Sequence, residues 1–423
     1  MASDNPPPID LNVIALSYHL GGMTRFAVQL MRALQDSGAI RRLRFVSHGS
    51  ALDLHREILK SHGVECEFLD VPPAMSPSLG SGCFSVRREA YEGCNVAWVP
   101  VLHYHTVPRA MSFRTVGSFH DAMYDKVPQL VASAPAWVVE FQHEITQQWL
   151  DSKAVVVCSS RFWFQHLDAH FDIRESNVRL IPVTGGHKVP PLVSPPGREW
   201  PWFSKPYLLC PANLSAHKNH ETLLEGYAKS GVHWPLVLTG NGSDFRDPRP
   251  FARRIGRRLF VALGRRRPDR PAVVRALASK LGLPIGKKLI PLGYIDEASY
   301  EAILGHAAAV VMPTLGEGGG SFPAEEAILH GVPVICSDIP VLREQMERIG
   351  ADVMWFDPHS SDALAERMRW VAAHHDEAKA AACAQISSLR SRSWSDVAAE
   401  YLDLFRSIAA RPETGRSDIA LTR

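Results

Sequence analysis

The chain has 423 residues, of which 46% are hydrophobic and 21% are charged, and its mean hydropathy is −0.09. At about 150 residues per domain this length predicts two or three domains, and the composition excludes disordered and fibrous proteins. No stretch reaches the roughly 18 apolar residues that a membrane-spanning helix needs, and the N-terminal MASDNPPPID lacks the basic and apolar regions of a signal peptide. We therefore expect a cytoplasmic protein.

The net charge of +2 argues against a dedicated nucleic-acid-binding protein, but the charge is unevenly distributed. Residues 246–270 hold ten arginines against two aspartates, which gives this segment a charge of +8 and leaves −6 for the rest of the chain. The seven cysteines form no CxxC pair, so neither a zinc knuckle nor a disulfide framework is indicated.

Short apolar segments alternate with helical patterns along the first half of the chain, which is typical of parallel sheets covered by helices. The clearest predicted helix is Met23–Leu34, in which Phe26, Leu30 and Leu34 share one face. The predicted strands are Ile9–Tyr18, Leu43–His48, Val96–His103, Thr115–His120, Ala154–Ser159 and Val178–Val183.

A proline-rich stretch, VPPLVSPPGREWPWFSKP at residues 189–206, interrupts this alternation, and we interpret it as an interdomain linker because proline neither continues a helix nor pairs inside a sheet. The alternation then resumes, and a polar stretch precedes the last helix. The predicted strands are Tyr207–Pro211, Pro235–Thr239, Lys288–Ile295, Ala307–Pro313, Val332–Ser337 and Asp352–Phe356. The predicted helices are His220–Lys229, Ala272–Leu281, Glu297–Ala307, Ala324–His330, Val341–Arg348, Asp362–Ala373 and Ser395–Ile408.

These patterns predict an α/β protein with two Rossmann-like, doubly wound domains, residues 1–190 and 207–385, that face each other across a cleft. Residues 191–206 are the predicted linker, residues 386–410 hold the last helix, and residues 411–423 form a tail with little to bury. Open α/β sheets bind ligands beyond the carboxyl ends of their strands, so we expect the chemistry in the residues that follow strands.

The segment after the predicted strand Ala307–Pro313 reads TLGEGGGSFPAEEAILHGVPV. Three consecutive glycines and Ser321 precede a helix there. Backbone N–H groups at a helix N-terminus bind anions, and glycines allow a phosphate to approach closely. Carboxylates on both sides of the glycines are acceptors suited to sugar hydroxyl groups. On spacing alone, a tight turn with capping acids explains the pattern equally well.

This segment resembles the glutamate-rich donor motif of the retaining GT-B glycosyltransferases of family 4, which use nucleotide-sugars. Other segments resemble that family's motifs in the same order along most of the chain. They are the glycine loop His19-Leu-Gly21-Gly22, the acceptor-domain histidine in Ser118-Phe-His120-Asp121, the basic motif Pro211-Ala-Asn213-Leu-Ser-Ala-His-Lys218-Asn219, the strand end Leu238-Thr-Gly240-Asn-Gly242, the nucleobase loop Pro291-Leu-Gly293-Tyr294-Ile, and Ser393-Trp394-Ser395. The resemblance implies a GT-B fold whose last helix crosses back to the first domain.

Two departures from the family pattern matter. The family's two glutamates are separated by seven residues, which selects Glu325, whereas counting back from Gly331 selects Glu326. We prefer Glu326, because a helix register is harder to shift than a glycine loop. The family's basic motif also has an arginine five residues before its lysine, where this chain has Asn213. Part of the charge compensation for a diphosphate must then come from elsewhere, or binding is weaker.

The resemblance implies three catalytic candidates. Lys218 would face the diphosphate, Glu317 the transferred sugar, and His120 the reactive face of that sugar. It also implies that Glu326 holds the ribose hydroxyl groups, and that the anomeric configuration is retained while a leaving phosphate oxygen takes the proton of the acceptor. The other donor-binding candidates are Gly21, Gly22, Asn213, Gly240, Gly293, Tyr294, Gly319, Gly320 and Ser321.

No D-x-D sequence occurs, so the metal-bound diphosphate arrangement of the other glycosyltransferase fold is not supported. We expect neither a metal nor a cofactor. His103 and His105 flank Tyr104 at a strand end, and without a matching carboxylate or cysteine set we favour a lining of the acceptor cleft over metal binding.

Within residues 246–270, Phe251, Ile255, Leu259 and Leu263 recur every four residues, and the arginines fall on other sides. This pattern predicts a basic amphipathic helix that suits an anionic membrane surface. A helix packed on its own domain and an oligomer contact are the alternatives. We do not expect nucleic acid as a partner, since no reading motif accompanies the arginines.

The sequence thus predicts a metal-independent, retaining glycosyltransferase that moves a sugar from a UDP- or GDP-sugar to a carbohydrate or lipid-linked acceptor, in surface polysaccharide or glycolipid assembly. It would act in the cytoplasm, peripheral to the membrane if residues 246–270 bind there. A sugar-nucleotide epimerase of the same fold would turn over the donor without an acceptor. A non-catalytic scaffold would bind UDP or GDP and neither transfer nor hydrolyse the sugar.

Overall fold

The computed structural model describes residues 8–16, 22–75, 84–131, 136–173, 178–186, 200–245, 269–390 and 392–411. The chain forms two compact units. The first unit consists of the residues up to Asp125, of Ala134–Thr184 and of the residues from Arg392 onward, and the second unit consists of Lys126–Ser133 and Gly185–Ser391. Both units therefore combine segments that are far apart in the sequence.

The first unit is built on a seven-stranded parallel sheet in the order β10-β9-β8-β6-β1-β2-β3. The strand order reverses beside β1, which pairs with β2 on one side and with β6 on the other. The strands are β1 (Ile9–Ile14), β2 (Ile40–Ser47), β3 (Glu67–Asp70), β6 (Val96–Val99), β8 (Thr115–Phe119), β9 (Val155–Cys158) and β10 (Val178–Leu180). A small second sheet joins β4 (Ala74–Met75), β5 (Phe84–Ser85) and β7 (His105–Thr106).

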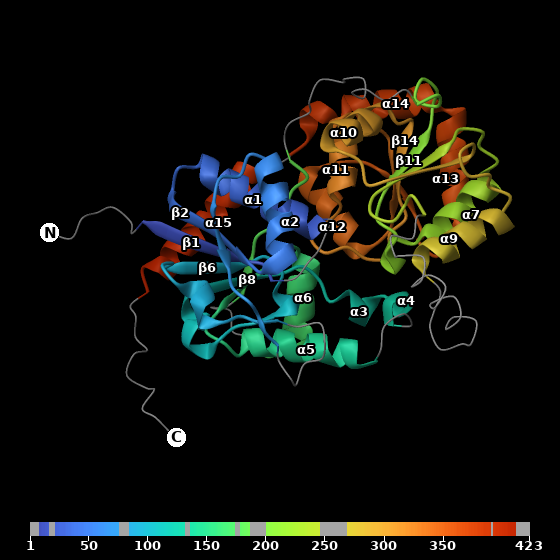
Figure 1. The fold of residues 1–423 in the computed structure, drawn as a ribbon. Coiled ribbons are helices and arrows are strands. Elements are labelled where there is room, and N and C mark those ends of the chain that lie inside the picture. The colour runs from blue at the N-terminus through green and yellow to red at the C-terminus, as the bar shows by residue number, and fades with distance from the viewer. Residues whose placement is uncertain are drawn as a thin grey trace. The chain divides into compact units, whose positions relative to one another are not determined.

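Helices cover both faces of the seven-stranded sheet, with α1, α2 and α15 on one face and α5 and α6 on the other (Figure 1). This doubly wound arrangement follows from the crossovers, because the chain runs outward from β1 in one direction and then returns to fill the other side. The helices are α1 (Gly22–Asp36), α2 (Gly49–Ser61), α5 (Ala136–Leu150), α6 (Arg161–His170) and α15 (Trp394–Ala409).

The last helix of the chain packs on the first unit, as the resemblance implied. A capping box formed by Ser393 and Asp396 begins α15. Its apolar face then contacts α1 and the sheet, where the Tyr401 hydroxyl lies 3.2 Å from Ser118 Oγ and the Tyr401 ring lies 5.8 Å from that of Trp98. The C-terminal segment is therefore part of the hydrophobic core of the first unit.

The second unit is built on a six-stranded parallel sheet in the order β13-β12-β11-β14-β15-β16. Successive residues of its strands enter two different cores, because side chains alternate across a sheet. In β11, for example, Leu208 and Cys210 lie in one core and Leu209 lies in the other. The strands are β11 (Leu208–Pro211), β12 (Leu236–Thr239), β13 (Leu289–Gly293), β14 (Ala309–Met312), β15 (Val334–Ser337) and β16 (Met354–Phe356).

The two cores of the second unit are closed by different helices. Apolar residues of α7, α9 and α13 fill one core, and those of α10, α11 and α12 fill the other. The helices are α4 (Pro128–Val131), α7 (His220–Ser230), α9 (Arg270–Lys280), α10 (Glu297–His306), α11 (Phe322–Leu329), α12 (Pro340–Ile349), α13 (Ser361–Ala373) and α14 (His375–Ala384), while α3 (Met123–Lys126) spans the boundary between the units. The predicted doubly wound α/β fold is confirmed in both units.

Every predicted strand and helix occurs, with ends that differ by up to four residues. The strand predicted at Val96–His103 ends at Val99, because Pro100 lacks the N–H group that would continue the sheet. The polar stretch expected before the last helix contains α14, whose buried residues are the small Ala378 and Ala382. Without large apolar residues, the pattern of this helix resembles that of a loop.

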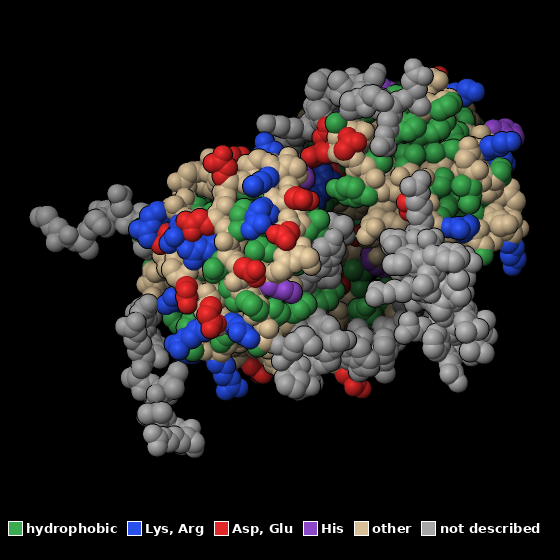
Figure 2. Space-filling view, in the orientation of Figure 1, with side chains coloured by type: hydrophobic (Ala, Val, Ile, Leu, Met, Phe, Trp, Pro, Cys, Tyr) green, Lys and Arg blue, Asp and Glu red, His purple; other side chains and the backbone are tan. Residues whose placement is uncertain are grey.

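The described helices include none that is long and apolar enough to cross a membrane. On the face seen in Figure 2, lysine and arginine side chains of the first unit lie beside acidic ones rather than in one basic patch. In the same unit Glu67 pairs with both Arg42 and Arg44, at 2.9 and 3.1 Å. Residues 246–268, which hold most of the basic segment, lie outside the described residues.

Candidate functional site

Lys218 and Glu317 lie at the carboxyl ends of neighbouring strands in the second unit. Lys218 ends the 3-10 turn η6 (Ala216–Lys218) after β11, and Glu317 lies in the loop after β14. The two loops flank the reversal of strand order, since β12 lies on the other side of β11. Lys218 Nζ donates a hydrogen bond to Glu317 Oε1 over 2.5 Å, and the two side chains are 16% and 9% exposed. A nearly buried ion pair thus occupies the place where such sheets bind ligands.

The two loops that carry this ion pair are bonded to each other. The N–H group of Leu315 and the hydroxyl of Thr314 both donate to the carbonyl of His217, at 2.7 and 3.1 Å. Asn219, the residue after the lysine, has a φ of 54°, and its side-chain amide donates to the carbonyl of Pro313. Asparagine tolerates this left-handed conformation better than most residues. The lysine side chain therefore starts from a backbone that is held on both sides.

The three glycines after Glu317 lead into α11. Gly320 has a φ of 117°, and a Cβ atom there would lie 2.5 Å from Gln345 Oε1, so the position requires glycine. The Ser321 hydroxyl caps α11 by accepting the N–H of Ala324, and the Ser321 N–H donates to Gln345 Oε1 over 2.7 Å. The polar groups of Ser321 thus shape the glycine loop from within the protein.

The two candidate glutamates of α11 have different environments. Glu325 is fully buried, and its Oε2 accepts a hydrogen bond from Gln345 Nε2 over 2.9 Å. Glu326 is 9% exposed, and its Oε2 accepts from the Tyr300 hydroxyl of α10 over 2.8 Å. Neither Gln345 nor Tyr300 is among the site residues predicted from the sequence. A signal for Gln345 was present, because it is a polar residue at a core-facing position of the predicted helix Val341–Arg348.

The remaining predicted donor residues of the second unit lie at the ends of β11, β12 and β13. Asn213 Oδ1 accepts the N–H of Ser215 over 3.0 Å and forms a turn with it. The N–H of Gly240 donates to the carbonyl of Gly293 over 2.8 Å, and both glycines have positive φ values. Tyr294 follows as a 73% exposed aromatic residue. The structure therefore brings these residues to the same sheet edge as Lys218 and Glu317.

His120 belongs to the first unit and follows β8. Its Nε2 lies 2.8 Å from the carbonyl oxygen of Pro100, which can only accept, so Nε2 carries the proton and Nδ1 is an acceptor. Burial lowers the pKa of His120 to about 4, against the opposite effect of this hydrogen bond. A neutral imidazole is therefore present at pH 7. Gly22 begins α1, and Gly21 lies outside the described residues.

The two histidines that flank Tyr104 are both buried in the first unit. His105 Nε2 accepts the N–H of Leu16 over 3.0 Å, and its Nδ1 lies 2.8 Å from the carbonyl oxygen of Val101. These bonds tie the residues after β1 to those after β6. His105 thus has a structural role at the carboxyl ends of the two central strands.

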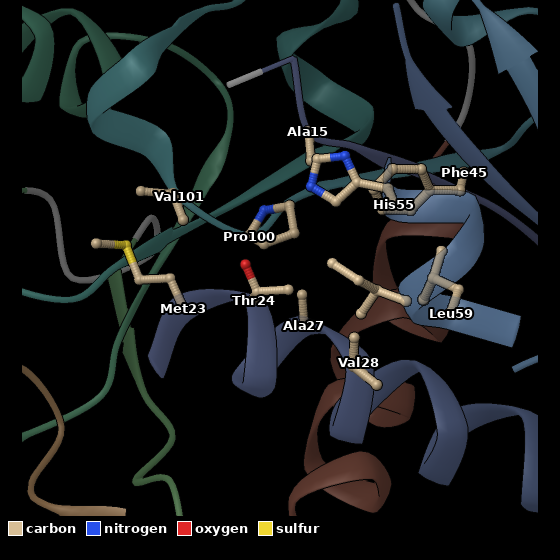
Figure 3. Close-up of a pocket in the computed structure, with 11 residues that line it drawn as sticks. Ala15, Met23, Thr24, Ala27, Val28, Phe45, His55, Leu59, Pro100 and Val101 are labelled. Carbon is tan, nitrogen blue, oxygen red and sulfur yellow. The ribbon is translucent and has the colours of Figure 1, made fainter. Parts of the chain in front are cut away.

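A small apolar pocket lies between α1 and α2 of the first unit (Figure 3). Thr24 and His55 are its polar lining residues, and His55 Nδ1 is bonded to the carbonyl oxygen of Ala51. Ala15 and Pro100, which follow β1 and β6, also line it. The pocket thus lies beside the reversal of strand order in the first sheet. In the part of the chain that the structure describes, no three histidine, cysteine or acidic side chains are grouped to hold a metal ion.

Comparisons with known proteins agree with this architecture. Residues 201–387, which hold Lys218, Glu317 and the glycine loop, match the family Glycosyl transferases group 1. Sucrose-phosphate synthase from Thermosynechococcus elongatus is similar in structure, with a TM-score of 0.64 at 17% identity over 95% of this chain and 99% of that chain. The fold is GT-B.

Two further GT-B structures are similar to the same extent. Anabaena HepE, in complex with UDP and glucose, has a TM-score of 0.64 at 14% identity, covering 94% of this chain and 100% of that chain. WaaG, a glycosyltransferase involved in lipopolysaccharide biosynthesis, has a TM-score of 0.64 at 14% identity, covering 93% and 99%. No curated protein matches the chain. The family match and the GT-B fold together support a glycosyltransferase.

Buried histidines predict that both units lose stability in acid. Burial lowers the pKa of His103 in the first unit and of His220 in the second to about 3. Between pH 6.5 and 3 the unfolded chain binds more protons at these positions than the folded chain, so stability falls as the pH falls. Each histidine should cost about 2 kcal/mol at pH 5 relative to pH 7.5.

Urea unfolding at pH 7.5, 6 and 5 measures this loss. The variant His220→Leu should show a shallower decline for the second unit than the unmodified protein shows. Equal stability at pH 5 and pH 7.5 would contradict the expectation.

Proposed function

We propose that the protein is a retaining, metal-independent glycosyltransferase that transfers a sugar from a UDP- or GDP-sugar to a carbohydrate or lipid-linked acceptor. The observation that carries this proposal is the Lys218–Glu317 pair beside the glycine loop of α11, at the reversal point of a GT-B sheet. The family match of residues 201–387 and the neighbours that contain UDP support it.

In this proposal the diphosphate of the donor is neutralised by the protein itself. The ammonium of Lys218 is a compact cation, and backbone N–H groups of the glycine loop add fixed dipoles without steric hindrance. As the bond between the anomeric carbon and the phosphate oxygen breaks, negative charge grows on the leaving group, and these groups stabilise it.

Glu317 contacts the transferred sugar, Glu326 accepts hydrogen bonds from the ribose hydroxyl groups, and neutral His120 accepts one from the sugar. The acceptor hydroxyl attacks the anomeric carbon on the face that the leaving group departs from. Its proton passes to the leaving phosphate oxygen. The configuration is then retained, and no protein nucleophile is required.

The acceptor and the place of action extend the same proposal. A lipid-linked acceptor in surface polysaccharide or glycolipid assembly would bring the enzyme to the cytoplasmic face of a membrane, and the charge of +8 in residues 246–270 suits an anionic surface there.

Thermal unfolding in the presence of UDP, GDP and ADP and of their sugars tests the function. A ligand at 100 times its dissociation constant should stabilise the protein by about 2.7 kcal/mol. Sugar transfer to an acceptor should accompany the stabilising donor. Donor turnover without an acceptor would instead indicate an epimerase, and binding without any turnover would indicate a scaffold.

A further inference from the structure

Gln345 is a buried amide on α12 that contacts the glycine loop and α11 together. Its side chain is 3% exposed. Its Oε1 accepts the N–H of Ser321 over 2.7 Å, and its Nε2 donates to the carbonyl of Ser321 over 3.1 Å. The same Nε2 donates to Glu325 Oε2 over 2.9 Å. One side chain thus uses its carbonyl and both amide hydrogens on two residues of the motif.

These three hydrogen bonds specify an amide in one orientation. A flipped amide would place hydrogens against the Ser321 N–H and an oxygen against two acceptors. An isosteric carboxylate would face the Ser321 carbonyl and the Glu325 carboxylate without a hydrogen to share. Gly320 is in contact with the same amide, because a Cβ atom there would lie 2.5 Å from Oε1. Gln345 therefore holds Ser321, the residue at which the glycine loop ends and α11 begins.

Of the two glutamates of α11, Gln345 bonds only Glu325 in the described contacts. Both carboxylates are buried, Glu325 completely and Glu326 with 9% exposed; Glu325 is bonded to Gln345, and Glu326 to Tyr300 of α10. The two carboxylates are therefore held by different helices. With Glu325 directed into the core, the carboxylate that remains for the ligand side is Glu326.

We propose that Gln345 is a positioning residue of the donor site, which orients the glycine-loop N–H groups and holds Glu325 away from the donor. This inference rests on the proposed function and deepens it, since it names the side chain that shapes the phosphate-binding loop. The hydrogen bonds of Gln345 go to Ser321 and Glu325, so the residue acts through the loop and through α11.

Calorimetric titration with UDP and with GDP tests the proposal in the full chain. Gln345→Leu removes all three hydrogen bonds at similar size, and Gln345→Glu keeps an acceptor for Ser321 N–H but sets a carboxylate against Glu325. Both variants should bind the nucleotide at least about tenfold more weakly, because the loop loses its fixed position. Adding Glu325→Gln to Gln345→Glu should restore part of the affinity, since an amide again faces a carboxylate.

The dissociation constant of the nucleotide distinguishes a displaced glycine loop from partial unfolding of the variant. A variant that only unfolds in part binds fewer nucleotides per chain with an unchanged dissociation constant. The control is Tyr207→Phe, which removes a buried 2.6 Å hydrogen bond to the carbonyl of Ile303. Tyr207 lies in the core that α10, α11 and α12 close, and its hydroxyl is bonded to α10 and not to the glycine loop. This variant should leave the dissociation constant of the nucleotide within about twofold of that of the unmodified protein.

Two further variants keep the test decisive if the Gln345 variants do not fold. Glu326→Gln should weaken nucleotide binding by about tenfold, because hydrogen bonds to a charged acceptor contribute more than those to a neutral one. Glu325→Gln should weaken it by less than about threefold, because Glu325 is buried against Gln345. The reverse order, or unchanged affinity in both Gln345 variants, overturns the inference alone. An unmodified protein that binds none of the nucleotides overturns the proposed function and this inference with it.

Discussion

Lys218→Ala should weaken the binding of the nucleoside diphosphate by about 100-fold or more, which corresponds to about 2.7 kcal/mol. Lys218 stands at the reversal point of the sheet, and Asn213, whose oxygen forms a turn, stands where the basic motif that this segment resembles has an arginine. The lysine must therefore carry a larger share of the charge compensation than it would beside an arginine. Calorimetric titration with UDP and GDP measures the change.

A lysine elsewhere in the same unit provides the control. Lys229 lies on α7, is 47% exposed and pairs with Asp362 at 2.9 Å. Lys229→Ala removes the same charge from the unit but not from the site, so its nucleotide affinity should stay close to that of the unmodified protein. Equal affinities of Lys218→Ala and Lys229→Ala would show that the diphosphate binds elsewhere.

Glu317→Gln should reduce sugar transfer by about 100-fold or more while nucleotide binding is kept or strengthened, in line with the loss of one preorganised charge in an active site. Glu317 forms an ion pair with Lys218, so a diphosphate that binds the ammonium must compete with this carboxylate. A neutral amide at the position releases the lysine. The transferred sugar, in contrast, loses its charged contact.

Steady-state kinetics of transfer and calorimetric titration with the nucleotide separate these two effects. The exposed Glu366 on α13 offers a matched control, since Glu366→Gln makes the same change far from the loops. Nucleotide binding that falls together with turnover in Glu317→Gln would mean that Glu317 supports the lysine rather than the sugar.

The strands and helices of the second unit were predictable because each buries large apolar side chains that form a recognisable pattern within its own segment. All six strands of its sheet were predicted from short apolar runs, since strands that are buried on both faces read as continuous hydrophobic segments. The helices between them carry large apolar residues at helical spacing. The helix α14 departs from this rule, because it packs through Ala378 and Ala382 and shows little amphipathic pattern. Local pattern thus predicts an element only where large side chains are buried.

The positions of Lys218, Glu317 and the glycine loop could also be inferred before any coordinates, because parallel strands end at the same edge of their sheet. The sequence by itself determined the residue types at that edge and the α/β class. Only the tertiary structure decided that Gln345 holds Ser321 and Glu325, and that Tyr300 holds Glu326. Hydrogen bonds between residues twenty or more positions apart depend on how whole helices pack against each other. The periodicity of one segment carries no information about that packing.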